Sequence, residues 1–184
     1  LPQYTNATVF GGAGDDIITG GNYDDSLYGG YGDDNLYGGR GNDILVGGAG
    51  NDYLEGGAGN DTYIFRAGDG QDTISNYDST IGDDLLKLEG LNADELWFEK
   101  SGNHLLIRLV GTEDQVTVNN WYLNDYYKIG TIEAEGSTLA YTQVAQMVQA
   151  MASLGAPGAV DGNWTDEQRE SLNPIIGTYW QPRV

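Results

Sequence analysis

Apolar side chains recur with a period of nine positions through the first third of the chain. The recurring positions are Ile18, Leu27, Leu36, Leu45, Leu54 and Tyr63. Each is the middle of three residues that point outward, inward and outward, which is typical of a short β-strand with one buried side chain. Two glycines follow most of these strands and permit the positive φ angles of a tight turn. The pattern therefore predicts a solenoid of short strands and turns.

The period defines six nine-residue units over residues 11–64, without an insertion. Glycine fills the first two positions of every unit and also the fourth, except at Tyr23. Two units are expected to form one coil of a parallel roll, so that each unit lies beside the next but one. Aspartate fills every sixth position: Asp16, Asp25, Asp34, Asp43, Asp52 and Asp61. The stacking pairs Asp16 with Asp34, Asp25 with Asp43, Asp34 with Asp52, and Asp43 with Asp61.

Aspartates stacked in this way repel one another unless a cation lies between them. Residues 11–64 hold ten acids and one base, a net charge of −9, which four divalent ions in the four pairs would nearly cancel. Turn carbonyls would add neutral oxygen ligands, and an all-oxygen site with two carboxylates favours Ca²⁺. The glycines expected at these sites are Gly12, Gly14, Gly21, Gly30, Gly32, Gly39, Gly41, Gly48, Gly50, Gly57 and Gly59.

A seventh unit follows over residues 67–75, shifted by two residues. It brings Asp72 to the sixth position and Ile74 to the eighth. Asp72 would complete a fifth site with Asp52. We therefore expect about four to five Ca²⁺ ions in the roll.

The units match the pattern G-G-x-G-x-D-x-U-x, and the segment resembles the RTX (repeats-in-toxin) family. The stretch from GDGQDTI to VTVNNWY also resembles the region after the repeats in RTX toxins, including adenylate cyclase toxins. The resemblance implies a calcium-binding β-roll in a bacterial protein that is secreted through a type I apparatus by an uncleaved C-terminal signal. A disordered glycine-rich linker is disfavoured, because linkers lack an aspartate at strict spacing.

The composition changes after the roll, where glycine thins and alternating strands are predicted. They cover residues 83–88, 95–100, 104–110, 115–119 and 131–135. We expect a compact antiparallel unit that caps the open end of the solenoid. The predicted fold is therefore all-β, a parallel β-roll with an antiparallel β cap and short C-terminal helices. The predicted domains are the roll (1–75), the cap (76–141) and a helical tail (142–184).

Two helices are predicted in the tail. The first runs over about 142–154, with Thr142 as a possible N-cap and an apolar stripe at Val144, Met147, Val148 and Met151. The second begins with a capping box at Thr165 and is expected to end near Pro174. These helices either pack on the cap or serve as the secretion signal. For residues 164–184 we favour the signal, and for 142–154 both alternatives stay open.

Charge and composition exclude several kinds of partner. A net charge of −20 argues against nucleic acid and anionic membrane surfaces, which need clustered bases. Cysteine is absent and His104 is the only histidine, so disulfides and zinc centres are not expected. The start of the sequence shows no secretion leader, and we expect a monomeric fragment of a larger chain.

Catalysis within these residues is not expected. The aspartates of the repeats are assigned to metal, and no G-x-S-x-G motif occurs. Any catalytic domain of the parent protein would lie upstream, and the passenger would be a toxin, hydrolase or adhesin. The alternative function is a structural or adhesive solenoid of a surface adhesin. A threonine ladder would favour it, but only Thr19 and Thr62 lie at the strand positions of the six units.

Overall fold

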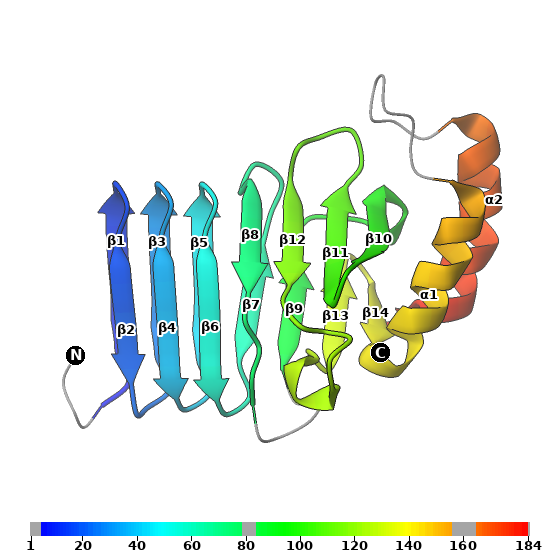
Figure 1. The fold of residues 1–184 in the computed structure, drawn as a ribbon. Helices are drawn as coiled ribbons and strands as arrows, with labels where there is room; N and C mark the ends of the chain where they lie inside the picture. The colour runs from blue at the N-terminus through cyan, green and yellow to red at the C-terminus, as the bar shows by residue number, and fades with distance from the viewer. Residues whose placement is uncertain (1–4, 79–83, 156–164, 184) are drawn as a thin grey trace.

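The computed structural model describes residues 5–78, 84–155 and 165–183, and its strands form two sheets around one core (Figure 1). One sheet has the strand order β1-β3-β5-β7-β9-β13-β14-β15 and the other β10-β11-β12-β8-β6-β4-β2. The strands are β1 (Thr8–Ala13), β2 (Ile17–Gly21), β3 (Ser26–Tyr31), β4 (Asn35–Arg40), β5 (Ile44–Ala49), β6 (Tyr53–Ala58), β7 (Thr62–Phe65), β8 (Gln71–Ile74), β9 (Leu85–Leu88), β10 (Leu96–Ser101), β11 (His104–Leu109), β12 (Gln115–Val118), β13 (Thr131–Ala134), β14 (Ser137–Ala140) and β15 (Gln181–Pro182). The helices are α1 (Tyr141–Leu154) and α2 (Asp166–Tyr179), with short 3₁₀ turns at Ala93–Glu95 and Asp125–Tyr127.

Successive strands of the roll alternate between the two sheets, so each strand is parallel to the next but one. Ile18 pairs with Leu36 across β2 and β4, and Leu27 pairs with Leu45 across β3 and β5. The eighth position of all six units is buried. The predicted register and the predicted fold class are confirmed, because only this arrangement places every eighth side chain between the sheets.

The buried rows of the roll continue into the cap without a break. In one sheet a single row crosses six strands, and all its side chains are completely buried: Leu27, Leu45, Tyr63, Leu86, Ile132 and Leu139. In the other sheet Ile74 pairs with Val118, which pairs with Leu105. Each such side chain contributes roughly 1.5–3 kcal/mol by leaving water. Roll and cap therefore share one core.

The cap contains the expected antiparallel pairs β10–β11–β12 and β13–β14. Its junction with the roll is parallel instead, through β8–β12, β7–β9 and β9–β13. The sequence prediction also lacked β14, which follows the turn at Gly136. Parallel pairs at the junction let the cap satisfy the backbone of the last coil while antiparallel strands close the sheets.

Helices α1 and α2 stand at the end of the molecule opposite β1 and β2 (Figure 1). Val144, Met147 and Met151 of α1 are completely buried, and Trp180 after α2 packs edge-on against Phe98 at a centroid distance of 6.1 Å. Both helices therefore belong to the shared core and pack on the cap, which is one of the two alternatives that the sequence left open. Among the described residues, no helix is long and apolar enough to cross a membrane.

Two details of the helix predictions were wrong. Thr142 is not the N-cap, because β14 leads directly into α1 and the Tyr141 amide donates to the Gly130 carbonyl at 2.9 Å. The second helix does not end near Pro174 but continues to Tyr179. Ile175, Ile176 and Tyr179 pack against the core, which favours helix beyond the proline. The capping box at Thr165 is present.

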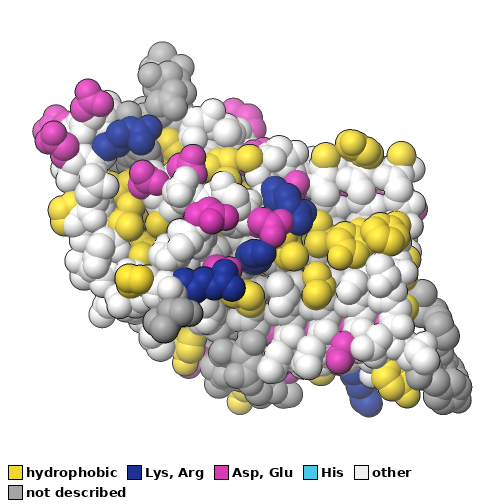
Figure 2. Space-filling model, turned by 180° about the vertical axis from the view of Figure 1, so that it is seen from behind, with side chains coloured by type: hydrophobic (Ala, Val, Ile, Leu, Met, Phe, Trp, Pro, Cys, Tyr) yellow, Lys and Arg dark blue, Asp and Glu magenta, His cyan; other side chains and the backbone are white. Residues whose placement is uncertain are grey.

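The outer face of the larger sheet carries an apolar row across the roll (Figure 2). Register places Phe10, Tyr28, Val46 and Ile64 side by side, and the Phe10 and Tyr28 rings stack at 4.8 Å. The row ends at the cap, where Lys87 and Arg66 both form ion pairs with Glu89.

Candidate calcium sites

The sixth-position aspartates, together with Asp84 beyond the repeats, form two columns, one along each turn edge of the roll. The first column holds Asp16, Asp34, Asp52 and Asp72, and the second holds Asp25, Asp43, Asp61 and Asp84. Within each column one carboxylate oxygen, Oδ1, accepts a hydrogen bond from the sixth-position amide one coil nearer the N-terminus. The distances between N and Oδ1 lie between 2.7 and 3.0 Å along both columns. One oxygen of each interior aspartate thus fixes the spacing of the coils.

The second carboxylate oxygen, Oδ2, lacks a protein partner at most of these positions. It is buried without a hydrogen bond in Asp16, Asp34, Asp43, Asp52 and Asp72. Asp34 and Asp43 are each only 1% exposed. A buried carboxylate oxygen without a donor is costly in free energy unless a cation compensates it.

In each of the six units, the first glycine keeps open a cradle beside the Oδ2 atom of the sixth-position aspartate. A side chain at Gly11 would begin 2.6 Å from Asp16 Oδ2 and 2.6 Å from the Gly29 carbonyl oxygen. At Gly20 the corresponding neighbours are Asp25 Oδ2 and the Gly38 carbonyl. A carboxylate oxygen and a carbonyl oxygen therefore face the same small space, a donor set that suits a hard cation such as Ca²⁺.

The electrostatics also favour a bound cation. Burial raises the pKa of Asp43 and Asp52 to about 6, of Asp61 to about 7 and of Asp72 to about 8. Backbone hydrogen bonds oppose this effect, and neighbouring carboxylates add to it by repulsion. A divalent ion would remove the repulsion and keep the aspartates ionised.

The structure brings the predicted aspartates together in the predicted pairs, Asp52 with Asp72 included. The predicted glycines of the second and fourth positions all have positive φ. The carbonyls of Gly12 and Gly14 lie against Gly30 and Gly32 of the next coil. The first glycines, which line the cradles, were missing from the prediction. Their presence in all six units was the signal that could have identified them.

A second ladder, formed by the fifth positions, was also missed. Asp15, Asp24 and Asp33 accept hydrogen bonds at Oδ1 from the fifth-position amides of the next coil, at 2.8–2.9 Å. Asn42 Oδ1 likewise accepts a hydrogen bond from the Asn60 amide. An amide oxygen and a carboxylate oxygen serve equally as acceptors, which explains why both residue types occur at this position.

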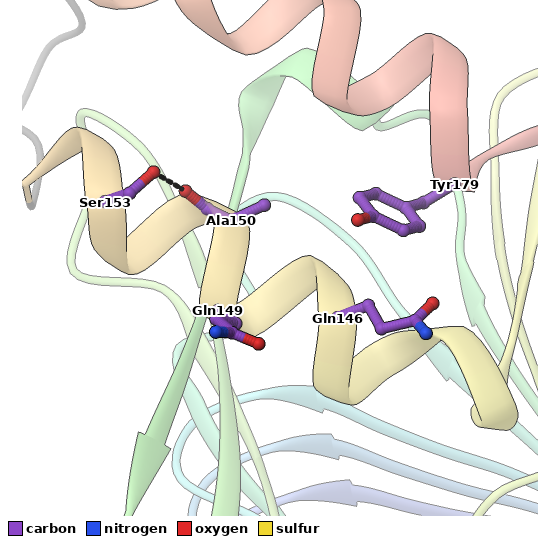
Figure 3. Close-up of a pocket in the computed structure, with 5 residues that line it drawn as sticks. All are labelled: Gln146, Gln149, Ala150, Ser153 and Tyr179. Carbon is purple, nitrogen blue, oxygen red and sulfur yellow. Dashed lines mark hydrogen bonds between the residues drawn. The ribbon is translucent and has the colours of Figure 1, made fainter.

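A pocket of about 480 Å³ lies between the two helices and is lined by Gln146, Gln149, Ala150, Ser153 and Tyr179 (Figure 3). Ser153 donates to the Ala150 carbonyl at 2.6 Å, so its hydroxyl is engaged within α1. The pocket holds no acid–base pair. No group of three or more His, Cys, Asp or Glu side chains is arranged to hold a metal ion within the described parts of the chain. The sites proposed below pair two carboxylates with backbone oxygens.

A parallel roll with aspartate columns along both edges defines a β-roll protein of the metal-binding class. The model of the RTX calcium-binding nonapeptide repeat (four copies) matches residues 10–45, 28–63 and 37–74. The model of the haemolysin-type calcium-binding protein related domain matches residues 104–141. The chain therefore carries RTX calcium-binding nonapeptide repeats over residues 10–74 and a haemolysin-type calcium-binding protein related domain over residues 104–141.

One relative is the iron-regulated protein FrpA of Neisseria meningitidis serogroup C, which is 40% identical over 94 residues. The match covers 48% of this chain and 8% of that protein, so the chain spans only a small part of its relative. Two subunits of the Azotobacter vinelandii mannuronan C5-epimerase are similar solved structures. The AlgE6R3 subunit is 28% identical, with 58% of this chain and 71% of that chain covered and a TM-score of 0.45. The AlgE6R2 subunit is 29% identical, with 66% and 90% covered and a TM-score of 0.49.

Proposed function

We propose that this chain is a folding module whose roll orders only when calcium fills its aspartate columns. The observation that carries the proposal is the row of buried Oδ2 atoms without partners, of which Asp34 and Asp43 are the most deeply buried. Without cations, folding would bury these carboxylates beside one another at a large cost in free energy. With cations, the same carboxylates become ligands, and binding free energy becomes folding free energy.

Five aspartate pairs each contain at least one such Oδ2 atom: Asp16/Asp34, Asp34/Asp52, Asp52/Asp72, Asp25/Asp43 and Asp43/Asp61. In each pair the backbone amide of the first aspartate donates to the Oδ1 atom of the second. The first glycine of the unit keeps open the space beside the Oδ2 atom of the first aspartate. The bound calcium would supply positive charge and accept oxygen ligands. The residues themselves set the spacing, exclude water and keep the outer oxygens aimed at the cradle.

This dependence suits a protein that crosses a membrane unfolded and folds outside the cell. RTX repeats are typical of secreted proteins, and calcium is scarce inside cells and abundant outside. At low calcium a net charge of −20 favours an expanded chain. We propose that the module is exported by a type I secretion apparatus, folds on meeting extracellular calcium, and supports the folding of a larger toxin, hydrolase or adhesin. Any catalytic activity would belong to that larger protein.

Far-UV circular dichroism of the chain in EDTA, in millimolar CaCl₂ and in millimolar MgCl₂ tests the proposal. We expect β structure to increase in calcium but not in magnesium, because Mg²⁺ demands a tighter octahedral shell. The matched variants are Asp43→Asn, which alters a buried ligand, and Asp24→Asn, which keeps the acceptor oxygen of the fifth-position ladder. A spectrum that is the same in EDTA and in calcium would refute the proposal.

A further inference from the structure

Both aspartate columns end at the junction between roll and cap, at Asp72 in the first column and Asp84 in the second. Asp72 Oδ1 accepts from the Asp52 amide at 3.0 Å, and Asp84 Oδ1 accepts from the Asp61 amide at 2.8 Å. Each residue is 2% exposed. Although Asp84 stands outside the nine-residue period, its inner oxygen has the same role as that of any repeat aspartate.

The outer oxygens of these two residues differ. Asp72 Oδ2 is buried without a hydrogen-bond partner. Asp84 Oδ2 accepts a hydrogen bond from Asn76 Nδ2 at 2.8 Å, and Asn76 is itself only 3% exposed. At the end of the second column an amide donor thus contacts the outer carboxylate oxygen, whereas the equivalent oxygen at the end of the first column has no hydrogen-bond partner.

The orientation of the Asn76 amide is fixed by a second buried group. The Tyr63 hydroxyl donates to Asn76 Oδ1 at 2.8 Å and accepts from the Gly56 amide at 2.9 Å. Tyr63 is completely buried and is the one eighth-position residue of the six units that carries a polar atom. With Oδ1 committed as an acceptor, Asn76 must present its Nδ2 donor to Asp84.

We propose that Asn76 closes the second column to calcium, so that the Asp61/Asp84 pair holds no ion while the Asp52/Asp72 pair holds one. The Asn76 amide interacts with Asp84 Oδ2 in the place that a cation would otherwise take. An N–H group that points at the site also repels a cation. Tyr63 acts as a positioning residue that keeps the amide in this orientation. The inference rests on the proposed function, because it concerns which aspartate pairs bind calcium.

Native mass spectrometry tests this proposal by counting bound calcium ions per chain, with magnesium as the control for nonspecific adducts. Asp72→Asn and Asp84→Asn are matched variants, since each keeps the Oδ1 acceptor and changes only the outer atom. We expect Asp72→Asn to bind one ion fewer than the wild type and Asp84→Asn to bind the same number. Loss of an ion in Asp84→Asn, or no loss in Asp72→Asn, would overturn the proposal.

A double variant covers the case in which Asp84→Asn fails to fold. Exchanging the two residues, Asn76→Asp with Asp84→Asn, keeps a donor facing an acceptor and leaves the Tyr63 hydroxyl a partner. The exchanged protein should bind as many ions as the wild type, and loss of an ion from it would contradict the proposal. A wild-type chain that binds no calcium at all would instead refute the proposed function, so the two failures are distinguishable.

Discussion

Asp33 and Asp34 are neighbours in the chain, but their side chains tie the coil to opposite neighbours. Asp33 Oδ1 accepts from the Asn51 amide, one coil nearer the cap, at 2.8 Å. Asp34 Oδ1 accepts from the Asp16 amide, one coil nearer the N-terminus, at 2.7 Å. The two ladders therefore run in opposite directions along the same turn edge, and only the Asp34 ladder leaves a second oxygen buried and unpartnered.

This difference predicts unequal effects of the same substitution. Asp33→Asn keeps its acceptor oxygen and should leave the calcium midpoint of folding nearly unchanged. Asp34→Asn replaces one carboxylate that two proposed sites share and should raise the midpoint about tenfold or more, equivalent to roughly 1.4 kcal/mol or more. Calcium titration followed by circular dichroism measures both midpoints. Equal shifts would mean that the two ladders do not differ in metal binding.

The calcium-free protein should become more stable as the pH falls. Burial raises the pKa of Asp61 to about 7 and of Asp72 to about 8, whereas unfolded aspartate titrates near ~3.9. Groups whose pKa is raised by folding stabilise the fold fully below the unfolded pKa, and this contribution is lost progressively as pH rises from about 4 to the folded pKa values of about 7 and 8. In EDTA, circular dichroism should show more β structure at pH 5 than at pH 8. The opposite trend would show that these carboxylates are not buried without metal.

With calcium present, protons and the ion compete for the same carboxylates. The calcium midpoint should therefore be lowest near pH 8 and should rise as pH falls below about 6. Asp24 belongs to the fifth-position ladder, so Asp24→Asn is the control that should keep this pH profile.

Gly48 illustrates how closely the coils approach. Its φ is +101°, and an added Cβ would collide with the Gly30 carbonyl oxygen of the preceding coil. Gly12 has a similar φ of +110°, but nothing lies within 4 Å of its Cβ position. Gly12→Ala should cost about 1–2 kcal/mol of unfolding free energy through backbone strain alone. Gly48→Ala should cost clearly more, as urea unfolding in saturating calcium would measure. Equal losses would show that the coils can separate freely.

Truncation separates the contributions of cap and tail. Ending the chain after Ser75 removes the strands that pair with β7 and β8, so the buried Tyr63 and Ile74 would become exposed. We expect a 1–75 fragment not to fold in calcium. Ending it after Leu154 removes Leu172 and Trp180, which are 1% and 4% exposed, and should lower the unfolding temperature without abolishing the roll. Thermal unfolding in calcium compares the three chains, and a cooperative transition in the 1–75 fragment would show that the cap is dispensable.

The sequence predicted the roll well because its period repeats one local rule six times. A sixth-position aspartate and an eighth-position apolar residue fix both the register and the inward face, and the structure has both. The repeat pattern does not predict which residues end the array. Asp84 was missed because it stands 23 residues after Asp61 rather than 18, and Asn76 because its role depends on the Tyr63 hydroxyl.

The helical tail shows the limit of local signals more clearly. Pro174 usually marks the end of a helix, yet the packing of Ile176 and Tyr179 favours continuation, and this tertiary contact cannot be deduced from the residues alone. The strands β9 and β12 were predicted, but their parallel pairing with the roll was missed for a similar reason. The alternation of apolar residues gives the inward face of a strand but not the direction of its neighbour. The position of the secretion signal remains a prediction.

The interval of 18 residues between ladder partners limits how an array of this kind can change in length. Loss or duplication of a single nine-residue unit would transfer every earlier turn to the opposite edge relative to the cap. The earlier turns of the column that ends at Asp72 would then lead to Asp84 and Asn76, and the earlier turns of the other column would lead to Asp72. Gain or loss of a whole coil leaves both endings matched to their own columns. Viable relatives with longer or shorter rolls and the same cap should therefore differ by even numbers of repeats.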